Sequence, residues 1–246
     1  MWLRGQDLNL RPSGYEPDEL PGWREVPLAR LLQDRLNLPA RLENDANAAA
    51  LGEWRFGAGR GTASLVFVTV STGIGGGVIS DNRIVHGRRG LTVKLANAIT
   101  NESERCHCGA VGCFEAVTSG TALGRHATAL TKPGDGSALR TLSHDREVTG
   151  RHVVEGARGG DEAALGLIDR EARWLGIGFT NLLHLYSPDM IVMGCGISHG
   201  HDLLRKPLEA TIQERAMPAY RDVPVVPAQL GRHAGLIGAA SLIFLD

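Results

Sequence analysis

Three of the four cysteines of this 246-residue chain fall in one short run, Cys106-His107-Cys108-Gly109-Ala110-Val111-Gly112-Cys113. Thiolates spaced Cys-x-Cys and Cys-x4-Cys on a glycine-rich turn can converge on one soft metal ion. Zn2+ is the expected metal, because it takes sulfur ligands in a tetrahedral shell. A water molecule is the expected fourth ligand. His107 is the alternative, although the alternation of the chain turns its side chain away from the cysteines.

A second glycine-rich segment precedes this run, at Ser71-Thr72-Gly73-Ile74-Gly75-Gly76-Gly77. Glycine lacks a Cβ and reaches positive φ, so such a turn can bring backbone N–H groups against phosphate oxygens, and Thr72 adds a hydroxyl donor. It is neither a Walker A loop nor a Gly-x-Gly-x-x-Gly turn that begins a helix. The alternative interpretation is a structural β-hairpin turn.

Two shorter motifs lie next to apolar runs. Asp45 follows Asn44 ahead of an alanine-rich run, where a carboxylate can take a proton from a substrate hydroxyl; the alternative is helix capping. Gly194-Cys195-Gly196 allows close approach of a flat ligand such as an adenine, and the alternative is an ordinary β-turn. Cys195 is expected to be a small buried residue rather than a metal ligand.

The elements that must position these residues alternate between helix and strand, which predicts an α/β fold. The apolar pattern predicts helices over 26–37, 48–54, 115–130, 162–186 and 235–245. It predicts strands over 40–42, 64–70, 78–80, 190–193 and 223–227, the second and third of them joined as a hairpin. Residues 131–160 are expected to form a loop with one short helix, and residues 1–20 a tail that is disordered or not native to the protein.

Composition excludes several classes of protein. The formal net charge is −1, so bulk binding to nucleic acid or to an anionic membrane is not indicated. No apolar run reaches the roughly 18 residues that a membrane span requires. Four cysteines, three of them clustered, do not form a secreted disulfide framework, and metal-binding thiols imply a reducing, cytoplasmic setting.

Taken in order, four motifs resemble those of the ROK family, which comprises bacterial sugar kinases of the glucokinase type and sugar-responsive repressors. They are Asn44-Asp45-Ala46-Asn47, Ser71 to Gly77, Cys106-x-Cys108-Gly109-x-x-Gly112-Cys113-x-Glu115, and Val192-Met193-Gly194-Cys195-Gly196. The resemblance covers about residues 21–246. It implies an actin-like, ribonuclease H-like ATPase fold in which two α/β domains flank a cleft for ATP and sugar.

The resemblance also implies roles for single residues. Asp45 would be the catalytic base on the sugar hydroxyl, and Asn44 and Glu115 would contact the sugar. The nucleotide would be bound by Thr72, Gly73 and Gly75 of the phosphate-binding turn, and by Gly194 and Gly196 near the adenosine. Structural Zn2+ would be held by Cys106, Cys108 and Cys113. Mg2+ would accompany ATP, because phosphoryl transfer depends on positioning and charge neutralisation.

The chain departs from the family pattern in two places. The Asp-x-Gly-Gly-Thr phosphate loop with which the family begins does not occur, so we expect an N-terminally truncated member with an incomplete small domain. The family motif Gly-x-x-Gly-Glu-x-Gly-His corresponds to residues 90–97 of this chain. In this alignment Lys94 takes the place of the Glu and Asn97 the place of the His. Lys94 reverses a charge, and Asn97 is a poor zinc ligand beside imidazole.

Three functional hypotheses follow. The first is an ATP-dependent hexose kinase by descent, acting on glucose or an N-acetylhexosamine with impaired activity. The second is the sugar-binding domain of a ROK-type repressor that lacks its DNA-binding part, and the third is a non-functional fragment. The expected domains are 21–62 plus 235–246, a remnant of the small domain, and 63–234, the large domain with phosphate turn and cysteines. The family's frequent dimers and tetramers make a homodimer the expected assembly.

Overall fold

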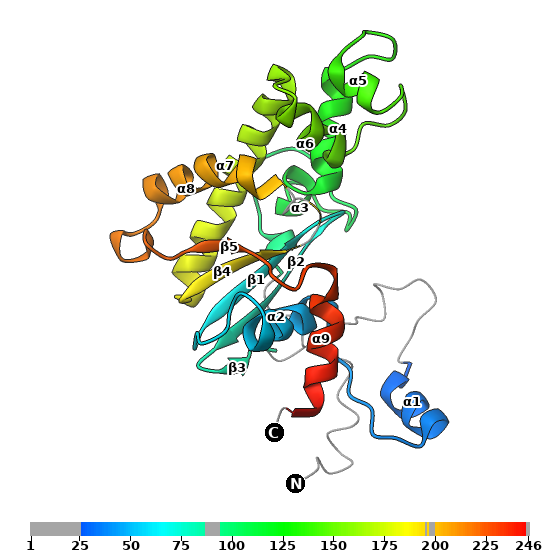
Figure 1. The fold of residues 1–246 in the computed structure, drawn as a ribbon, viewed down its shortest axis with the longest axis vertical. Coiled ribbons are helices and arrows are strands. Elements are labelled where there is room, and N and C mark those ends of the chain that lie inside the picture. Colours follow the sequence, from blue (N-terminus) through cyan, green and yellow to red (C-terminus); the bar gives the residue numbers. More distant parts are fainter. Residues whose placement is uncertain (1–25, 87–93, 195, 197–199, 245–246) are drawn as a thin grey trace.

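The computed structural model describes residues 26–86, 94–194, 196 and 200–244. At its centre lies a five-stranded sheet in the order β3-β2-β1-β4-β5 (Figure 1). The strands are β1 (Leu65–Val70), β2 (Ile74–Ser80), β3 (Arg83–Ile84), β4 (Met190–Gly194) and β5 (Val225–Pro227). β2 is antiparallel to both β1 and β3, whereas β4 runs parallel to β1 and β5 parallel to β4. The carboxyl ends of β1, β4 and β5 therefore meet at one edge of the sheet.

Helices cover both faces of this sheet (Figure 1). The described helices are α1 (Leu28–Leu36), α2 (Asp45–Phe56), α3 (Phe114–Val117), α4 (Gly120–Leu130), α5 (Ala138–Leu142), α6 (Gly150–Arg158), α7 (Glu162–Tyr186), α8 (His201–Arg215) and α9 (Ala234–Ser241). Among them, α1 buries no residue and lies apart from the sheet (Figure 1). Leu65 and Phe67 of β1 pack into a core with α2 and α9. The alternate residues of the strand, Val66, Val68 and Val70, pack into a second core with α4, α6, α7 and α8. Burial on both faces explains why β1 is apolar throughout.

Several predicted elements form with nearly the predicted bounds. α7 begins at Glu162 and ends at Tyr186, and β1, β4, β5, α1 and α9 lie close to where the apolar pattern predicts them. The second strand of the hairpin is longer than predicted, because β2 begins at Ile74 rather than at Val78. α1 ends at Leu36, and the C-cap residue Asn37 has a φ of 51°, the left-handed conformation typical of a helix C-terminus. The α/β class is confirmed.

Other predicted elements are wrong. Residues 40–42 form no strand. The predicted helix 115–130 is two helices, because the chain is extended at Thr118 and Ser119, and the Ser119 hydroxyl accepts from Ala122 N to cap α4. The segment 131–160 contains both α5 and α6 rather than one short helix, and α8 was not predicted.

The predicted division into 21–62 plus 235–246 and 63–234 stays a prediction. One observation bears on it: α2 and α9 share a core with β1 and β4, so helices of the smaller predicted unit lie on the sheet of the larger one.

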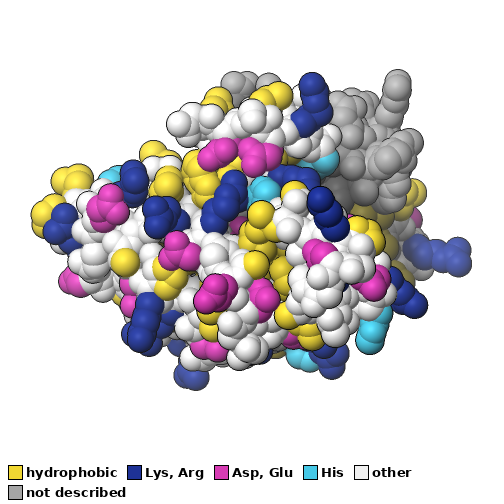
Figure 2. All heavy atoms as spheres, turned by 90° about the horizontal axis from the view of Figure 1, so that it is seen from above, with side chains coloured by type: hydrophobic (Ala, Val, Ile, Leu, Met, Phe, Trp, Pro, Cys, Tyr) yellow, Lys and Arg dark blue, Asp and Glu magenta, His cyan; other side chains and the backbone are white. Residues whose placement is uncertain are grey.

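The surface carries both signs of charge. On the described part of the face in Figure 2, acidic and basic side chains are interspersed, as expected for a net charge of −1. No helix within the described ranges is long and apolar enough to cross a membrane.

Candidate active site

The N-terminus of α2 carries the predicted base. Asn44 is the N-cap residue, and its Oδ1 accepts from the backbone N–H of Ala46 at 3.0 Å and of Asn47 at 3.2 Å. Oδ1 of Asp45 also accepts from Ala46 N–H, at 2.8 Å, so the capping alternative applies to both residues. Nδ2 of Asn44 takes no part in these bonds. Asp45 is the first residue of the helix and is exposed, so its carboxylate can be reached by a ligand.

The β1–β2 turn lies beside this helix end. It consists of Ser71, Thr72 and Gly73, since Val70 already pairs with Ile74 and the strand β2 begins there. Gly75 and Gly77 are therefore strand residues, not turn residues. A Cβ on Gly77 would lie 2.7 Å from Ala50 Cβ, so glycine there lets α2 pack against the sheet. Thr72 is exposed at the tip of the turn.

Glu115 connects this turn to the cysteine run. Its Oε2 accepts from the backbone N–H of Ile74 at 2.8 Å, and a Cβ on Gly73 would overlap the same oxygen. Its Oε1 lies 3.0 Å from Nδ1 of His107. The structure thus brings the predicted sugar-binding carboxylate against the predicted phosphate turn, 41 residues away in sequence.

The loop after β4 lies next to the loop after β1. Gly194 is the last residue of β4, and a Cβ there would lie 2.6 Å from Cζ of Phe67. A Cβ on Gly196 would lie 3.6 Å from the Ser71 hydroxyl. The predicted nucleotide-binding residues thus gather at the carboxyl ends of parallel strands, where α/β sheets bind ligands. Cys195 and residues 90–93, named in the sequence analysis, lie outside the described residues.

The three clustered cysteines converge. All three Sγ atoms lie within 4.8 Å of one another, and Sγ of Cys108 and of Cys113 are 3.6 Å apart. Cys106 and Cys113 are buried and Cys108 is exposed. A hydrogen bond from the Ala110 backbone lowers the pKa of Cys108, whereas burial and the neighbouring thiols raise the pKa of Cys113 to about 11.

This donor set fits a zinc ion. Thiolates at the usual Zn–S distance of about 2.3 Å in a tetrahedron are about 3.8 Å apart, close to the separation observed between Cys108 and Cys113. Asn97, which the sequence analysis aligned with the histidine of the family motif, lies beside the cysteine cluster, with its Nδ2 3.7 Å from Cys108 Sγ. His107 Nδ1 is 3.9 Å from Cys106 Sγ, but it groups with Cys106 and Glu115 rather than with all three cysteines.

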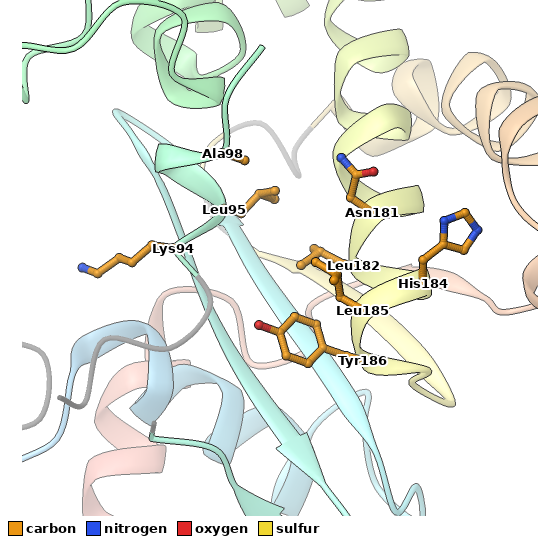
Figure 3. A pocket seen from close by; sticks show the side chains of 8 residues that line it. All are labelled: Lys94, Leu95, Ala98, Asn181, Leu182, His184, Leu185 and Tyr186. Carbon is orange, nitrogen blue, oxygen red and sulfur yellow. The ribbon is translucent and has the colours of Figure 1, made fainter. Parts of the chain in front are cut away.

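A hollow of about 350 Å³ lies between the segment of the 3₁₀ turn Leu95–Asn97 and the end of α7 (Figure 3). Lys94 lines it together with Tyr186, over a largely apolar floor. In Figure 3 the Lys94 ammonium points away from Asn181 and His184. Neither Asp45 nor Glu115 lines this hollow, so the candidate site is defined by the two carboxylates and the turn.

The sequence analysis missed a polar network that fastens the cysteine segment to α4 and α7. Arg170 donates to Nδ1 of His126 at 3.0 Å and lies 3.5 Å from Oε1 of Glu104. Because Nδ1 accepts, the proton of the neutral ring is on Nε2, which is 3.3 Å from the same Glu104 oxygen. Burial and the Arg170 charge lower the pKa of His126. No sequence spacing links these three residues.

A sequence model of the ROK family matches residues 15–244. This chain belongs to the ROK family. Over 227 residues it is 36% identical to a glucokinase of Halalkalibacterium halodurans, covering 90% of this chain and 68% of that protein. It is 29% identical to a xylose repressor of Caldicellulosiruptor bescii, covering 91% of this chain and 57% of the repressor.

A solved structure gives the same result for the fold. The ROK family glucokinase of Streptomyces griseus, in complex with glucose and AMPPNP, superposes with a TM-score of 0.81 at 35% identity, covering 94% of this chain and 77% of that one. The ROK family member is thus an α/β protein with the actin-like, ribonuclease H-like ATPase fold that the sequence motifs predicted.

Proposed function

We propose that this ROK family member is a sugar-kinase-like protein that binds ATP and a hexose and transfers the γ-phosphoryl group to a sugar hydroxyl. One arrangement carries the proposal: Glu115 and the residue after Asp45 both lie against the start of β2, directly after the turn. Glu115 is bonded to Ile74 N–H. Ala46, next to Asp45, comes within 3.4 Å of where a Cβ on Gly75 would lie. A sugar between the two carboxylates would lie beside bound phosphates.

The residues then have separate tasks. The exposed Asp45 carboxylate takes the proton of the attacking hydroxyl, and Asn44 Nδ2 and Glu115 hold other hydroxyls of the sugar. The nucleotide binds at the turn Thr72–Gly73, with Gly75 behind it, and at the loop Gly194–Gly196. Mg2+ bound with ATP would neutralise phosphate charge, and the other contribution of these residues is to position the two substrates.

The proposal includes structural zinc, which Cys106, Cys108 and Cys113 would hold and which would order the segment that carries Glu115. Activity should be impaired, because Lys94 and Asn97 replace the acidic and imidazole groups that the family pattern has there. An amide at Asn97 is a weaker zinc partner than imidazole. The proposal also includes that the protein is cytoplasmic, that it forms a homodimer, and that it divides into the two domains predicted from the sequence.

A second candidate is a sugar-binding module of a repressor. The match to a xylose repressor over 91% of the chain favours it. Such a module needs Glu115 and Asn44 for the sugar but does not need Asp45 as a base. The two candidates therefore differ in what Asp45 does.

The test combines calorimetry with a coupled ATP assay on the 246-residue chain. Glucose, N-acetylglucosamine and N-acetylmannosamine are the probes, and Asp45→Asn is the variant. The kinase-like proposal expects sugar binding, phosphorylation below about a hundredth of the rate of the Streptomyces griseus glucokinase, and loss of that residual rate in Asp45→Asn with sugar affinity kept.

Each alternative outcome is decisive. Sugar binding without any turnover, unchanged in Asp45→Asn, supports the repressor-type module. A rate equal to that of the Streptomyces griseus enzyme contradicts the impairment. A folded chain that binds neither ATP nor any sugar of the panel contradicts both functions.

A further inference from the structure

A buried carboxylate stands directly before the proposed sugar-binding residue Asn44. Glu43 precedes this N-cap of α2, and its side chain is only 5% exposed. Oε1 of Glu43 accepts from the backbone N–H of Asn44 at 2.9 Å and from Nδ2 of Asn47 at 2.9 Å. The helix dipole also favours a negative charge at this end of a helix. Glu43 therefore fastens the first turn of α2, which carries Asp45.

The second oxygen of this carboxylate reaches a different part of the fold. Oε2 of Glu43 accepts from Nε2 of His86 at 2.6 Å, a short hydrogen bond. Burial raises the pKa of Glu43, but the bonds from His86 and Asn47 outweigh it and leave this pKa below its usual value. The bond to Glu43 raises the pKa of His86. Both shifts favour the charged forms, so the two side chains form an ion pair.

The edge of the sheet holds His86 in place. His86 follows the edge strand β3, and the N–H of Val85 beside it donates to Val78 O of β2 at 2.9 Å. The His86 side chain is 41% exposed, so the ring lies at the rim of the fold. Glu43, by contrast, belongs to the segment 37–44, which forms neither helix nor strand. The pair thus ties an irregular segment to the sheet at the point where that segment enters α2.

Loss of the imidazole would reach the start of α2 through Glu43. A buried carboxylate without its charged partner is unfavourable, so the Glu43 side chain would turn towards solvent. The Asn44 N–H and the Asn47 amide would then lose their acceptor, and Asn47 is only 2% exposed, which leaves little room for water to replace it. A displacement of about 1 Å in a group that acts on a substrate can slow the reaction about a hundredfold.

We propose that Glu43 and His86 are positioning residues for the sugar side of the site: the pair fixes the direction in which α2 presents Asn44 and Asp45. This inference rests on the proposed function and deepens it, because it adds two residues that lie outside the four family motifs. Neither residue needs to touch the sugar. The β1–β2 turn, proposed for the nucleotide, is fastened by a different carboxylate, that of Glu115. The pair should therefore affect sugar binding and rate, but not ATP binding.

A purely structural role is the competing explanation. A carboxylate at a helix N-terminus stabilises the fold wherever it occurs, and its loss would lower the melting temperature without singling out the sugar. The two explanations differ in which ligand is affected. They also differ in whether a side chain that restores only the hydrogen bond recovers sugar binding.

The test compares two substitutions of His86 in the 246-residue chain. His86→Ala removes the donor, whereas His86→Gln restores one, because the amide nitrogen of glutamine can reach the position of ring Nε2. His144→Asn is the control: it removes an exposed imidazole, and asparagine tolerates the φ of 50° found there. Calorimetry measures the affinity for ATP and for glucose, or for N-acetylglucosamine where glucose does not bind. The coupled assay measures the residual rate, and thermal unfolding measures stability.

We expect His86→Ala to weaken sugar binding about three- to tenfold and to lower the residual rate about tenfold or more, with ATP affinity unchanged. His86→Gln should recover most of both losses. In a Glu43→Gln background, His86→Ala should have little further effect, because both substitutions break the same bond. His144→Asn should behave as the wild type does. Where the wild type shows no turnover, the sugar affinities decide.

The other outcomes overturn the inference in distinguishable ways. Wild-type sugar affinity in His86→Ala refutes the positioning role and leaves the proposed function standing. Equal weakening of sugar and ATP binding, with a lower melting temperature that His86→Gln does not recover, makes the pair a stabilising contact only, which also refutes it. A wild-type chain that binds no sugar refutes the proposed function and this inference together.

Discussion

Nδ2 of Asn97 lies 3.7 Å from Sγ of Cys108, so an amide stands beside the exposed thiol of the cysteine cluster. The other two cysteines are buried, and the side of the cluster that is open to solvent is therefore the side that Asn97 faces. A fourth metal ligand supplied by the protein would come from this residue more directly than from His107, which faces Glu115.

The first prediction is that Asn97→His increases zinc affinity. An imidazole at this position supplies the nitrogen ligand that three cysteines lack, and the gain should be at least the roughly 10–100-fold that even outer-shell partners of a metal contribute. Chelator competition on purified protein measures it. Asn181→His, which also adds an exposed imidazole, is the control and should change nothing; equal affinity in Asn97→His and wild type would show that Asn97 is not at the metal.

The second prediction concerns the close approach of Gly73 and Glu115. A Cβ on residue 73 would overlap Oε2, so Gly73→Ala should displace the carboxylate and break its bond to Ile74 N–H. We expect sugar affinity to fall about tenfold while stability falls by no more than about 1 kcal/mol. In the Gly73→Ala background, Glu115→Ala should have little further effect, because the two substitutions remove the same interaction.

Gly166→Ala is the matched control for this experiment. Gly166 lies in α7 with open space where a Cβ would be, so alanine should raise helix stability by about 0.5–1 kcal/mol and leave sugar affinity unchanged. Equal effects of the two alanine substitutions on sugar binding would contradict a role for the Gly73–Glu115 contact.

The third prediction is a pH-dependent stability that comes from Glu171. Its side chain is fully buried in α7, Thr118 donates to Oε1 at 2.6 Å, and Oε2 has no partner among the described groups. Burial raises the pKa of Glu171 from 4.5 to about 8. The folded state therefore keeps a proton that the unfolded state releases, and stability should fall as pH rises from about 4.5 to about 8, by roughly 4–5 kcal/mol at full ionisation.

Glu171→Gln isolates this contribution. The amide carbonyl can still accept from Thr118, but the side chain no longer ionises, so the variant should gain stability relative to wild type as pH rises from 5 to 8.5. Urea unfolding at both pH values measures the difference. Glu162→Gln, an exposed position on the same helix, should follow the wild type; a parallel pH dependence in Glu171→Gln would refute the assignment.

The parts of the fold that rest on local pattern could be predicted from sequence. α7 has a long apolar period and Asp161 as an N-cap, and its predicted bounds are the observed ones. α8 was missed because it is polar and contains Pro207, although Leu204, Leu208 and Ile212 repeat every four residues and are buried. That spacing was the available signal.

The parts that rest on long-range contacts could not be predicted. The glycines of β2 were interpreted as a turn because their packing partners Ala46 and Ala50 lie on α2, which sequence alone does not bring to the strand. The cluster of cysteines was visible from spacing. The contact of Glu115 with Ile74 and the burial of Glu171 depend on the assembled fold.

The last prediction concerns Glu53, a fully buried carboxylate that joins α2 to the loop after β5. Oε2 accepts from the backbone N–H groups of Ala58 and Gln229 at 2.9 and 3.1 Å, and Oε1 accepts from Leu230 N–H at 2.8 Å. All three partners donate, so the side chain must offer two accepting atoms. Glu53→Gln would point an amide NH2 at donors and leave buried N–H groups without acceptors, at a loss of about 3 kcal/mol or more.

The exposed Asp189 provides the comparison, because its Oδ2 also accepts two backbone N–H groups, those of Ala63 and Ser64. In Asp189→Asn, water can replace the lost acceptor, so the loss of stability should stay near or below about 1 kcal/mol. Urea unfolding of both variants at one pH gives the ratio of the two effects. Similar small losses would mean that the loop after β5 rearranges at little cost and that Glu53 does not fix it, whereas a large loss confined to Glu53→Gln would identify this carboxylate as the group that holds α2 against the loop leading into α9.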